Sequence, residues 1–289
     1  MLIAQITDIH LGFEPDVPGE FNRQRLDRTL ATLCAISPAP AMLIATGDLI
    51  DRGDRDSYER LREALAVVPF PVHLVLGNHD ERDNFRSVFP QYRFVDGFLQ
   101  YEIDTPGLRI LVLDTLEEGR HGGAFCAERA AWLKARLGEQ PDRKTLIVLH
   151  HPPVELGIPW MNTDPDEPWV SRLADALSDK RNIVGLICGH IHRATSTGWK
   201  GTVVSSCPST APQVALDLRP IEPNSPDHRD LIVADPPAYA LHFWNGRELV
   251  THWDTAEDHA VLARYDHNLR GMIQDMVSER PNGSHKSAA

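Results

Sequence analysis

Short runs of apolar residues, rich in Ile, Val and Leu, recur along the first two thirds of the chain and predict buried β-strands. They cover residues 2–7, 41–46, 72–76, 109–113, 145–149 and 183–188. Between several of these runs, apolar residues three or four positions apart predict amphipathic helices, as in the series Leu26, Leu30 and Leu33. Because strands and helices alternate, we expect an α/β fold in which helices cover a largely parallel sheet.

The pattern changes after about residue 195. Residues 201–206, 240–244 and 248–253 read as strands, and Asn245-Gly246 between the last two is typical of a β-hairpin turn. Residues 216–238 contain five prolines, so we expect an extended arm there rather than a regular element.

The C-terminal region shows a helical pattern followed by a polar tail. Apolar positions recur at helical spacing from His259 to Val277 and predict an amphipathic helix that docks on this chain or on a neighbour. Residues 281–289 are small and polar, and we expect them to be disordered.

A chain of 289 residues is long for one domain and short for two. We expect a core at residues 1–210, with the arm and C-terminal strands at 211–258 belonging to the same domain. The helix and tail would form an appendage at residues 259–289.

The composition is that of an ordinary globular protein, with 42% hydrophobic and 24% charged residues. No apolar run approaches the ~18 residues that a membrane span needs. The chain starts directly with a strand pattern and not with a signal peptide, and its four cysteines lack CxxC spacing and fit a reducing compartment. These features predict a cytoplasmic protein.

The formal net charge of −12 also bears on partners. An acidic surface repels polyphosphates, so we expect neither a nucleic-acid polymer nor an anionic membrane as a partner. A bound divalent metal would reverse the sign of the charge locally.

Five of the predicted strands are each followed by a polar segment whose side chains can bind ligands or take part in catalysis. The segments read DIH at residues 8–10, GDLID at 47–51, GNHD at 77–80, HHPP at 150–153 and GHIH at 189–192. Parallel strands place their carboxyl ends at one edge of a sheet, where α/β folds bind ligands. Each segment alone is a weak signal, but five in this arrangement predict one common site.

The side chains in these segments suit metal ions. Carboxylate, imidazole and amide groups without thiolates fit Mn, Fe, Co or Zn at a hydrolytic centre. In DIH and GHIH we expect extended backbone that turns alternate side chains toward one ion. A bridging carboxylate would hold two ions, which together activate water and hold a phosphoryl group. The spacing does not decide between the adjacent His150 and His151.

The five motifs in this order resemble the calcineurin-like metallophosphoesterase superfamily. The match is closest to its bacterial class III cyclic-nucleotide phosphodiesterases and the related glycerophosphodiesterases, and it covers about residues 1–255. The resemblance implies a β-sandwich flanked by helices in an α-β-β-α arrangement, with a C-terminal hairpin and a terminal helix. It also implies that the C-terminal part contributes to a homo-oligomer, either a dimer or a larger assembly.

The resemblance also implies roles for individual residues. Two divalent metal ions would be held by seven side chains, with Asp48 as the bridge: Asp8, His10, Asp48, Asn78, His150, His190 and His192. His79 would not be a ligand but would contact the phosphate and assist departure of the alcohol. It would thus join Asp48 as a catalytic residue.

Other polar residues near the motifs are weaker candidates. His151, His121 and Trp160 are candidate substrate contacts. We expect Asp51 to lie behind the ligands and Asp80 to orient His79 or cap the following helix.

The expected function is hydrolysis of a small phosphodiester by in-line attack of a metal-bound hydroxide. The substrate would be a 3′,5′- or 2′,3′-cyclic nucleotide or a glycerophosphodiester. A phosphomonoesterase or protein phosphatase is the alternative within the enzyme class, and a non-catalytic binding module of the same fold is the alternative outside it.

Overall fold

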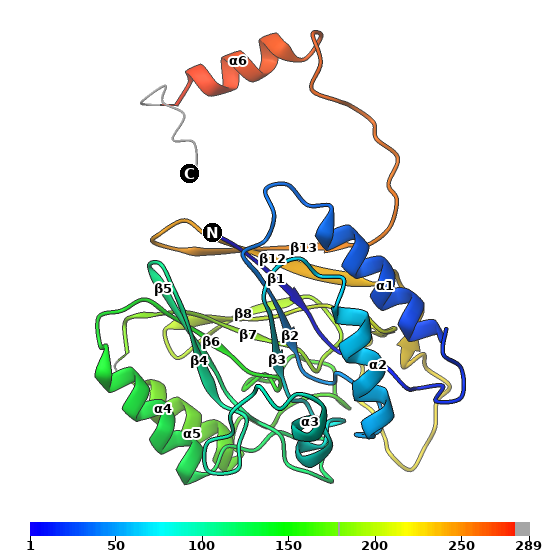
Figure 1. Cartoon of the computed structure of the whole chain (residues 1–289), viewed down its shortest axis with the longest axis vertical. Coiled ribbons are helices and arrows are strands. Elements are labelled where there is room, and N and C mark those ends of the chain that lie inside the picture. Colours follow the sequence, from blue (N-terminus) through cyan, green and yellow to red (C-terminus); the bar gives the residue numbers. More distant parts are fainter. Residues whose placement is uncertain (179, 281–289) are drawn as a thin grey trace. The chain divides into compact units, whose positions relative to one another are not determined.

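The computed structural model describes the chain except for residues 179 and 281–289, so the tail expected to be disordered lies outside the described residues. The chain divides into two compact units, Met1–Ala256 and Glu257–Ala289 (Figure 1). Each unit is considered by itself below.

The first unit is built on two β-sheets. One sheet has the order β13-β12-β1-β2-β3, and the other has the order β4-β5-β6-β7-β9-β8. The strands of the first sheet are β1 (Leu2–Ile6), β2 (Met42–Thr46), β3 (Val72–Val75), β12 (Ala238–Trp244) and β13 (Leu249–Thr255). Those of the second are β4 (Tyr101–Thr105), β5 (Leu108–Val112), β6 (Thr145–Val148), β7 (Ile183–Cys188), β8 (Thr195–Trp199) and β9 (Thr202–Ser206).

Three hydrophobic clusters define the layers. One joins Ile3 and Ile44 of the first sheet to Ile110 and Val148 of the second, so the sheets pack face to face. The outer face of the first sheet is covered by α1 (Phe21–Cys34), α2 (Arg55–Leu65) and α3 (Arg82–Val88). The outer face of the second is covered by α4 (Ala127–Glu139) and α5 (Pro168–Leu177). The α-β-β-α arrangement is therefore confirmed.

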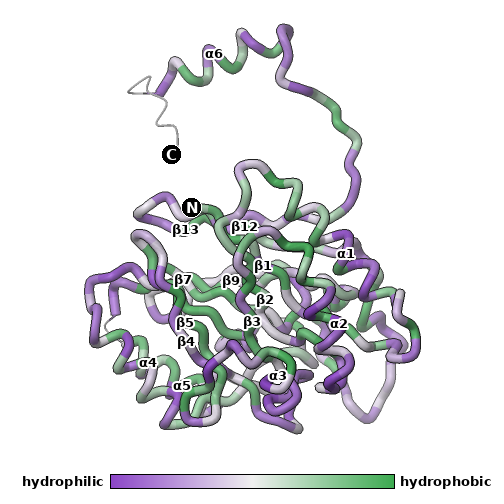
Figure 2. Tube along the Cα trace, in the orientation of Figure 1, coloured by the Kyte–Doolittle hydropathy of each residue, from purple (hydrophilic) through white to green (hydrophobic). Residues whose placement is uncertain are grey.

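The central strands consist mainly of hydrophobic residues (Figure 2), because helices cover one face of each sheet and the other sheet covers the second. In β1, Ile3 faces the second sheet, whereas Ala4 and Ile6 face the helices. β1, β2 and β3 are parallel, as are β5, β6, β7 and β9. Their carboxyl ends therefore deliver the polar loops to one region.

The predicted C-terminal hairpin is confirmed, since β12 and β13 pair antiparallel and β12 joins β1. The Pro-rich arm is not wholly irregular: β11 (Ile232–Val233) pairs with β10 (Gln213–Val214) and ties the two ends of the arm together. Strands β4 and β8 and helix α5 were not expected from the hydrophobic pattern.

The predicted C-terminal helix is present, but it begins later than the expected start at about His259. In the second unit, α6 spans only Arg270–Ser278. The carboxylate of Asp266 accepts the backbone N–H groups of Asn268 and Leu269, and such local bonds compete with helix formation. Of the helices in the described part of the chain, none is both long and apolar enough to span a bilayer.

His242 on β12 is fully buried, and both of its ring nitrogens are hydrogen-bonded to side chains of neighbouring strands. The Gln5 amide donates to Thr46 Oγ1 and to the Cys188 carbonyl, so its Oε1 accepts from His242 Nε2 at 2.9 Å. His242 Nδ1 then accepts from Thr251 Oγ1 at 2.9 Å. Both ring nitrogens are satisfied in the neutral form, and burial lowers the pKa of His242 to about 4.

This burial predicts acid sensitivity. The unfolded chain takes up a proton on His242 near pH 6.5, but the folded chain does so only near pH 4. Folding should therefore lose roughly 3 kcal/mol as the pH falls through this window. Urea unfolding at several pH values in excess chelator should show this loss in the wild type and much less of it in His242→Gln. Equal pH slopes for the two proteins would contradict the assignment.

Candidate metal centre

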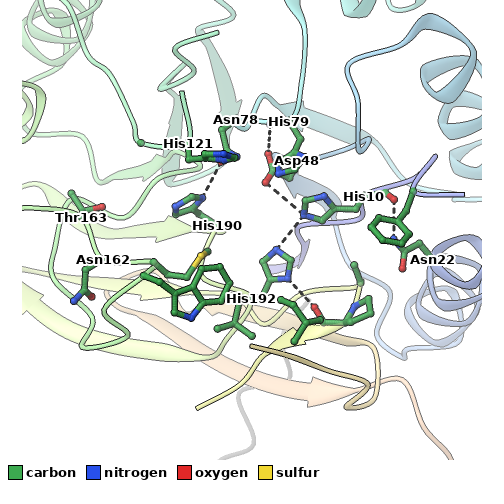
Figure 3. Close-up of a pocket in the computed structure, with 18 of the residues that line it drawn as sticks. His10, Asn22, Asp48, Asn78, His79, His121, Asn162, Thr163, His190 and His192 are labelled. Carbon is green, nitrogen blue, oxygen red and sulfur yellow. Dashed lines mark hydrogen bonds and ion pairs between the residues drawn. The ribbon is translucent and has the colours of Figure 1, made fainter. Parts of the chain in front are cut away.

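The polar loops that follow five strands meet where the two sheets adjoin (Figure 3). The loops after β1, β2 and β3 carry Asp8, His10, Asp48, Asn78 and His79. The loops after β6 and β7 of the other sheet carry His150, His190 and His192. The structure thus brings together all seven expected metal ligands, with both sheets contributing.

The ligand loops have a backbone that was not expected. Five of the candidate ligands have left-handed φ angles between 47° and 70°, namely Asp8, His10, Asp48, His190 and His192. The expectation of extended backbone in DIH and GHIH is therefore wrong. A left-handed residue on either side of Ile9 or Ile191 turns both polar side chains to the site and leaves the isoleucine fully buried. Such backbone is costly and concentrates at functional sites.

One group of donor atoms consists of Asp8, His10 and His192. The two imidazole Nε2 atoms are 3.2 Å apart, and His192 Nε2 is 3.4 Å from Asp8 Oδ1. Ligands about 2.0–2.1 Å from a tetrahedral ion lie roughly 3.3 Å from one another. The spacing therefore fits three ligands of one ion.

A second group consists of Asn78, His150 and His190. Asn78 Oδ1 is 3.3 Å from His150 Nε2 and 3.0 Å from His190 Nδ1. Asp48 Oδ2 lies 3.5 Å from His150 Nε2 and 3.6 Å from His10 Nε2. Asp48 thus stands between the two groups, as a bridging carboxylate must.

Main-chain groups fix the orientation of these donors. His150 Nδ1 donates to the Thr46 carbonyl and His192 Nδ1 to the Pro212 carbonyl, each at 2.8 Å, which directs the Nε2 lone pairs to the site. Asp48 Oδ1 accepts the His79 N–H at 2.9 Å, leaving Oδ2 for the centre. The residues present therefore fit a pair of divalent cations.

The electrostatics of the site favour positive charge. Burial alone would raise the pKa of Asp48, but His150 and then His10 hold it well below its ordinary value. Burial alone would lower the pKa of His150, but Asp48 raises it to about 9. A cation in this position meets ionised carboxylates, and its binding displaces protons from imidazole.

The structure favours His150 over His151 as a ligand. Both nitrogens of His151 are engaged, because Nδ1 lies 2.8 Å from Thr115 Oγ1 and Nε2 lies 3.2 Å from the His121 carbonyl. Burial, followed by the proximity of His150 and His190, holds the pKa of His151 well below its ordinary value. Neutral His151 therefore accepts from Thr115 and donates to the loop that carries His121.

His79 lies beside the first group, with its ring centroid 4.5 Å from that of His10. Its Nδ1 donates to the Asp51 carbonyl at 2.8 Å, which leaves Nε2 for a ligand. The Asp51 carboxylate lies 3.4 Å from His10 Nδ1, a position behind a candidate ligand.

Asp80 neither orients the His79 ring nor caps α3, so this expectation is wrong. It accepts the N–H groups of Gly77 and Leu49 and the Tyr58 hydroxyl, thereby holding the GNHD turn against α2. Glu81 caps α3 instead.

A cavity of about 810 Å³ opens above these groups. Among its described lining residues are His10, Asp48, Asn78, His79, His190 and His192, together with the expected substrate contacts His121 and Trp160. The His121 and His79 ring centroids are 6.2 Å apart. No Arg or Lys belongs to the described lining of this cavity.

Two residues of α1 that support the site were missed from the sequence. Asn22 donates to the His10 carbonyl at 2.9 Å. Buried Arg25 donates to the carbonyls of Thr210, Ala211 and Asp235 and so holds the chain next to Pro212. These two polar residues lie on the buried face of α1 together with Leu26. Their helical spacing relative to the apolar residues of that face was the sequence feature that could have predicted their burial.

Comparisons with known proteins show what this chain is similar to. A family model described as calcineurin-like phosphoesterase matches residues 1–194. The chain is 31% identical over 259 residues to a probable glycerophosphodiester phosphodiesterase of Arcobacter nitrofigilis, covering 87% of this chain and 92% of that protein. It is 36% identical over 203 residues to a probable cyclic nucleotide phosphodiesterase of Rhodopseudomonas palustris, covering 68% of this chain and 72% of the relative.

The fold is also similar to that of a solved structure. A dimetal phosphatase from Danio rerio matches with a TM-score of 0.59 at 15% identity, covering 87% of this chain and 98% of the other. This likeness concerns the fold.

Proposed function

Since the chain belongs to the calcineurin-like phosphoesterase family, we propose that it uses two divalent ions to hydrolyse small phosphodiesters. The observation that carries this proposal is the position of Asp48. Its Oδ2 lies 3.6 Å from His10 Nε2 and 3.5 Å from His150 Nε2, between two donor groups under one cavity. The donor set suits Mn, Fe, Zn or Co.

The bound ions and His79 would have different roles in the reaction. When bound, the ions supply Lewis-acid activation of water and neutralise charge on the phosphoryl group. His79, held at Nδ1 by the Asp51 carbonyl, presents Nε2 to the cavity. From there the imidazolium form, which carries a proton on Nε2 as well as on Nδ1, would donate a hydrogen bond to a phosphoryl oxygen and pass the Nε2 proton to the departing alcohol, leaving neutral His79.

The charge of the lining favours a diester. A monoester brings a second negative charge, which commonly requires a nearby cationic side chain. The described lining contains Glu14, Glu20 and Glu167 but no Arg or Lys. A protein phosphatase or other phosphomonoesterase is therefore the second candidate.

The relatives suggest two substrate classes, because one is named for glycerophosphodiesters and another for cyclic nucleotides. We include both in the proposal. The expected cytoplasmic location agrees with four free cysteines, and the expected homo-oligomer remains part of the proposal.

The test compares a diester and a monoester with the same leaving group. The protein is stripped of metal, reloaded with Mn²⁺, and assayed on methyl 4-nitrophenyl phosphate and 4-nitrophenyl phosphate. We expect kcat/KM to favour the diester by about tenfold or more, equivalent to roughly 1.4 kcal/mol of activation free energy. A monoester preference would support the phosphatase, and Mn²⁺ binding without turnover of either would support the binding module.

A further inference from the structure

The cavity above the candidate ligands has an extensive apolar lining. We use the term apolar lining for Phe13, Phe21, Trp160, Met161, Val214 and Ile232. Several of these side chains are open to solvent, including Phe13 with 61% and Ile232 with 53% of its surface exposed. Exposed aromatic and aliphatic groups collected around a site are typical of ligand contact.

One part of the apolar lining is fixed directly to the ligand loop. Ile191, the residue between His190 and His192, is fully buried in a small cluster with Ile158 and Val214. Met161 packs against the same cluster. The apolar lining therefore begins beside the donor atoms and is held by a packed core.

Phe13 is held in place although it is exposed. It stands between Gly12 and Glu14, whose N–H groups both donate to buried Glu20, at 2.5 and 2.8 Å. Gly12 also has a left-handed φ of 91°, which favours glycine. The buried carboxylate is compensated by these N–H groups and by Arg60, whose Nη1 lies 3.6 Å from Glu20 Oε1, so the loop holds the phenyl ring at the rim of the cavity.

Apart from the carboxylates of Glu14, Glu20 and Glu167, the polar side chains of the lining that lie away from the histidines are largely committed to main-chain groups. Asn162 Oδ1 accepts from the N–H groups of Leu156 and Gly157, and the Thr163 hydroxyl donates to the Pro152 carbonyl. The Asn22 amide donates to the His10 carbonyl. Away from the histidines, the described lining offers the indole N–H of Trp160 as its uncommitted side-chain donor.

We propose that the cavity selects phosphodiesters whose non-leaving ester group is apolar or aromatic, seated against the apolar lining. This inference rests on the proposed function. The phosphate would lie at the candidate ligands, and the organic group would cover Trp160, Met161 and Phe13. Against Trp160, Met161 and Phe13, a polyol such as glycerol would lose water contacts that these side chains do not replace, so it gains less from binding there, and the carboxylates of Glu14 and Glu167 are the acceptors that the lining offers it instead.

The test uses diesters that share the 4-nitrophenyl leaving group and differ in the other ester. Methyl, 2,3-dihydroxypropyl, choline and benzyl esters are compared on the Mn²⁺-loaded full chain. Because burying a phenyl-sized group is favourable, kcat/KM for the benzyl ester should exceed that of the methyl and dihydroxypropyl esters by about 10- to 100-fold. Phe13→Ala and Trp160→Ala should each lower the benzyl-to-methyl ratio. Phe243→Ala, an exposed phenylalanine outside the lining, should leave the ratio unchanged.

The outcomes separate this inference from the proposed function. Similar rates for all four diesters, or a preference for the dihydroxypropyl or choline ester, would overturn the inference and leave the phosphodiesterase intact. Failure to hydrolyse any diester would reject the proposed function. The inference about the apolar lining could then still be tested by calorimetry, comparing the affinities of the Mn²⁺-loaded protein for benzylphosphonate and methylphosphonate. Tighter binding of benzylphosphonate would support a role for the apolar lining, and equal affinities would exclude it.

Discussion

Asp48→Asn is expected to lose activity by roughly three orders of magnitude or more, because charge neutralisation by bound metal is worth several kcal/mol at the transition state. Asparagine tolerates the left-handed backbone at this position, where φ is 47°, and still accepts the His79 N–H. The change therefore removes the charge between His10 and His150 with little disturbance of the turn.

Thermal unfolding distinguishes this loss from misfolding. Ions that bind only the folded state at 100 times their Kd stabilise it by about 2.7 kcal/mol each, which corresponds to roughly 5–10 °C in a unit of this size. Wild type should show such a gain in Tm on adding Mn²⁺, and Asp48→Asn a much smaller one, with fewer ions retained by elemental analysis.

The metal-free proteins should differ in the same direction. Although burial alone would raise it, His150 and then His10 hold the pKa of Asp48 well below its ordinary value, so ionised Asp48 stabilises the folded protein without metal. In chelator at neutral pH, Asp48→Asn should therefore be less stable than wild type, and the comparison that matters is the rise in Tm on adding Mn²⁺. A variant that keeps two ions and the full rise in Tm would refute the bridging role.

His79→Ala is expected to lower kcat by about 10²- to 10⁴-fold, the usual contribution of a positioned acid or base. Metal content should stay at the wild-type level, because the two donor groups remain complete without His79. If Nε2 protonates the departing alcohol, the loss should be larger for an alkyl ester than for a 4-nitrophenyl ester, whose leaving group needs no proton.

The control for this variant is His252→Ala, which removes an exposed histidine on β13 outside the described lining of the cavity. It should retain wild-type kcat and metal content. Loss of an ion from His79→Ala would instead make His79 a ligand, a reading that its distance from His10 and Asp48 permits.

The core strands were predictable because burial on both faces leaves a run of mainly apolar residues, as in β1, where Gln5 is the one polar residue, and in β2, where Thr46 is. The half-buried strand β4, Tyr101–Thr105, was not predicted from the hydrophobic pattern. It carries polar residues because it lies at the edge of its sheet and pairs only with β5. Helix α5 had a signal in Pro168 at its first turn, which is a favoured position for proline. The sequence did not predict that the parallel strands divide between two sheets. This division depends on pairing between strands far apart in the chain, and the local pattern of apolar residues carries no information about such pairing.

The site was predictable as a set of side chains but not as a geometry. The motifs marked the loops that deliver the ligands, yet periodicity could not separate His150 from His151. That choice depends on Thr115 and the His121 carbonyl, which come from a different part of the chain. The backbone of Asp8 and His10 could not be predicted either, because Asp and His adopt a left-handed φ more often than most residues but far too rarely for their presence to mark it.

That left-handed backbone restricts how the metal preference of this site can be re-engineered. Aspartate, asparagine and histidine are the donor residues that tolerate such φ angles best, whereas longer or branched side chains do so poorly. Glutamate, glutamine and cysteine would offer useful donor atoms at Asp8, His10, Asp48, His190 or His192, but each would add backbone strain. A harder or softer ligand set is therefore most readily introduced at Asn78 and His150, whose φ angles lie outside the left-handed region.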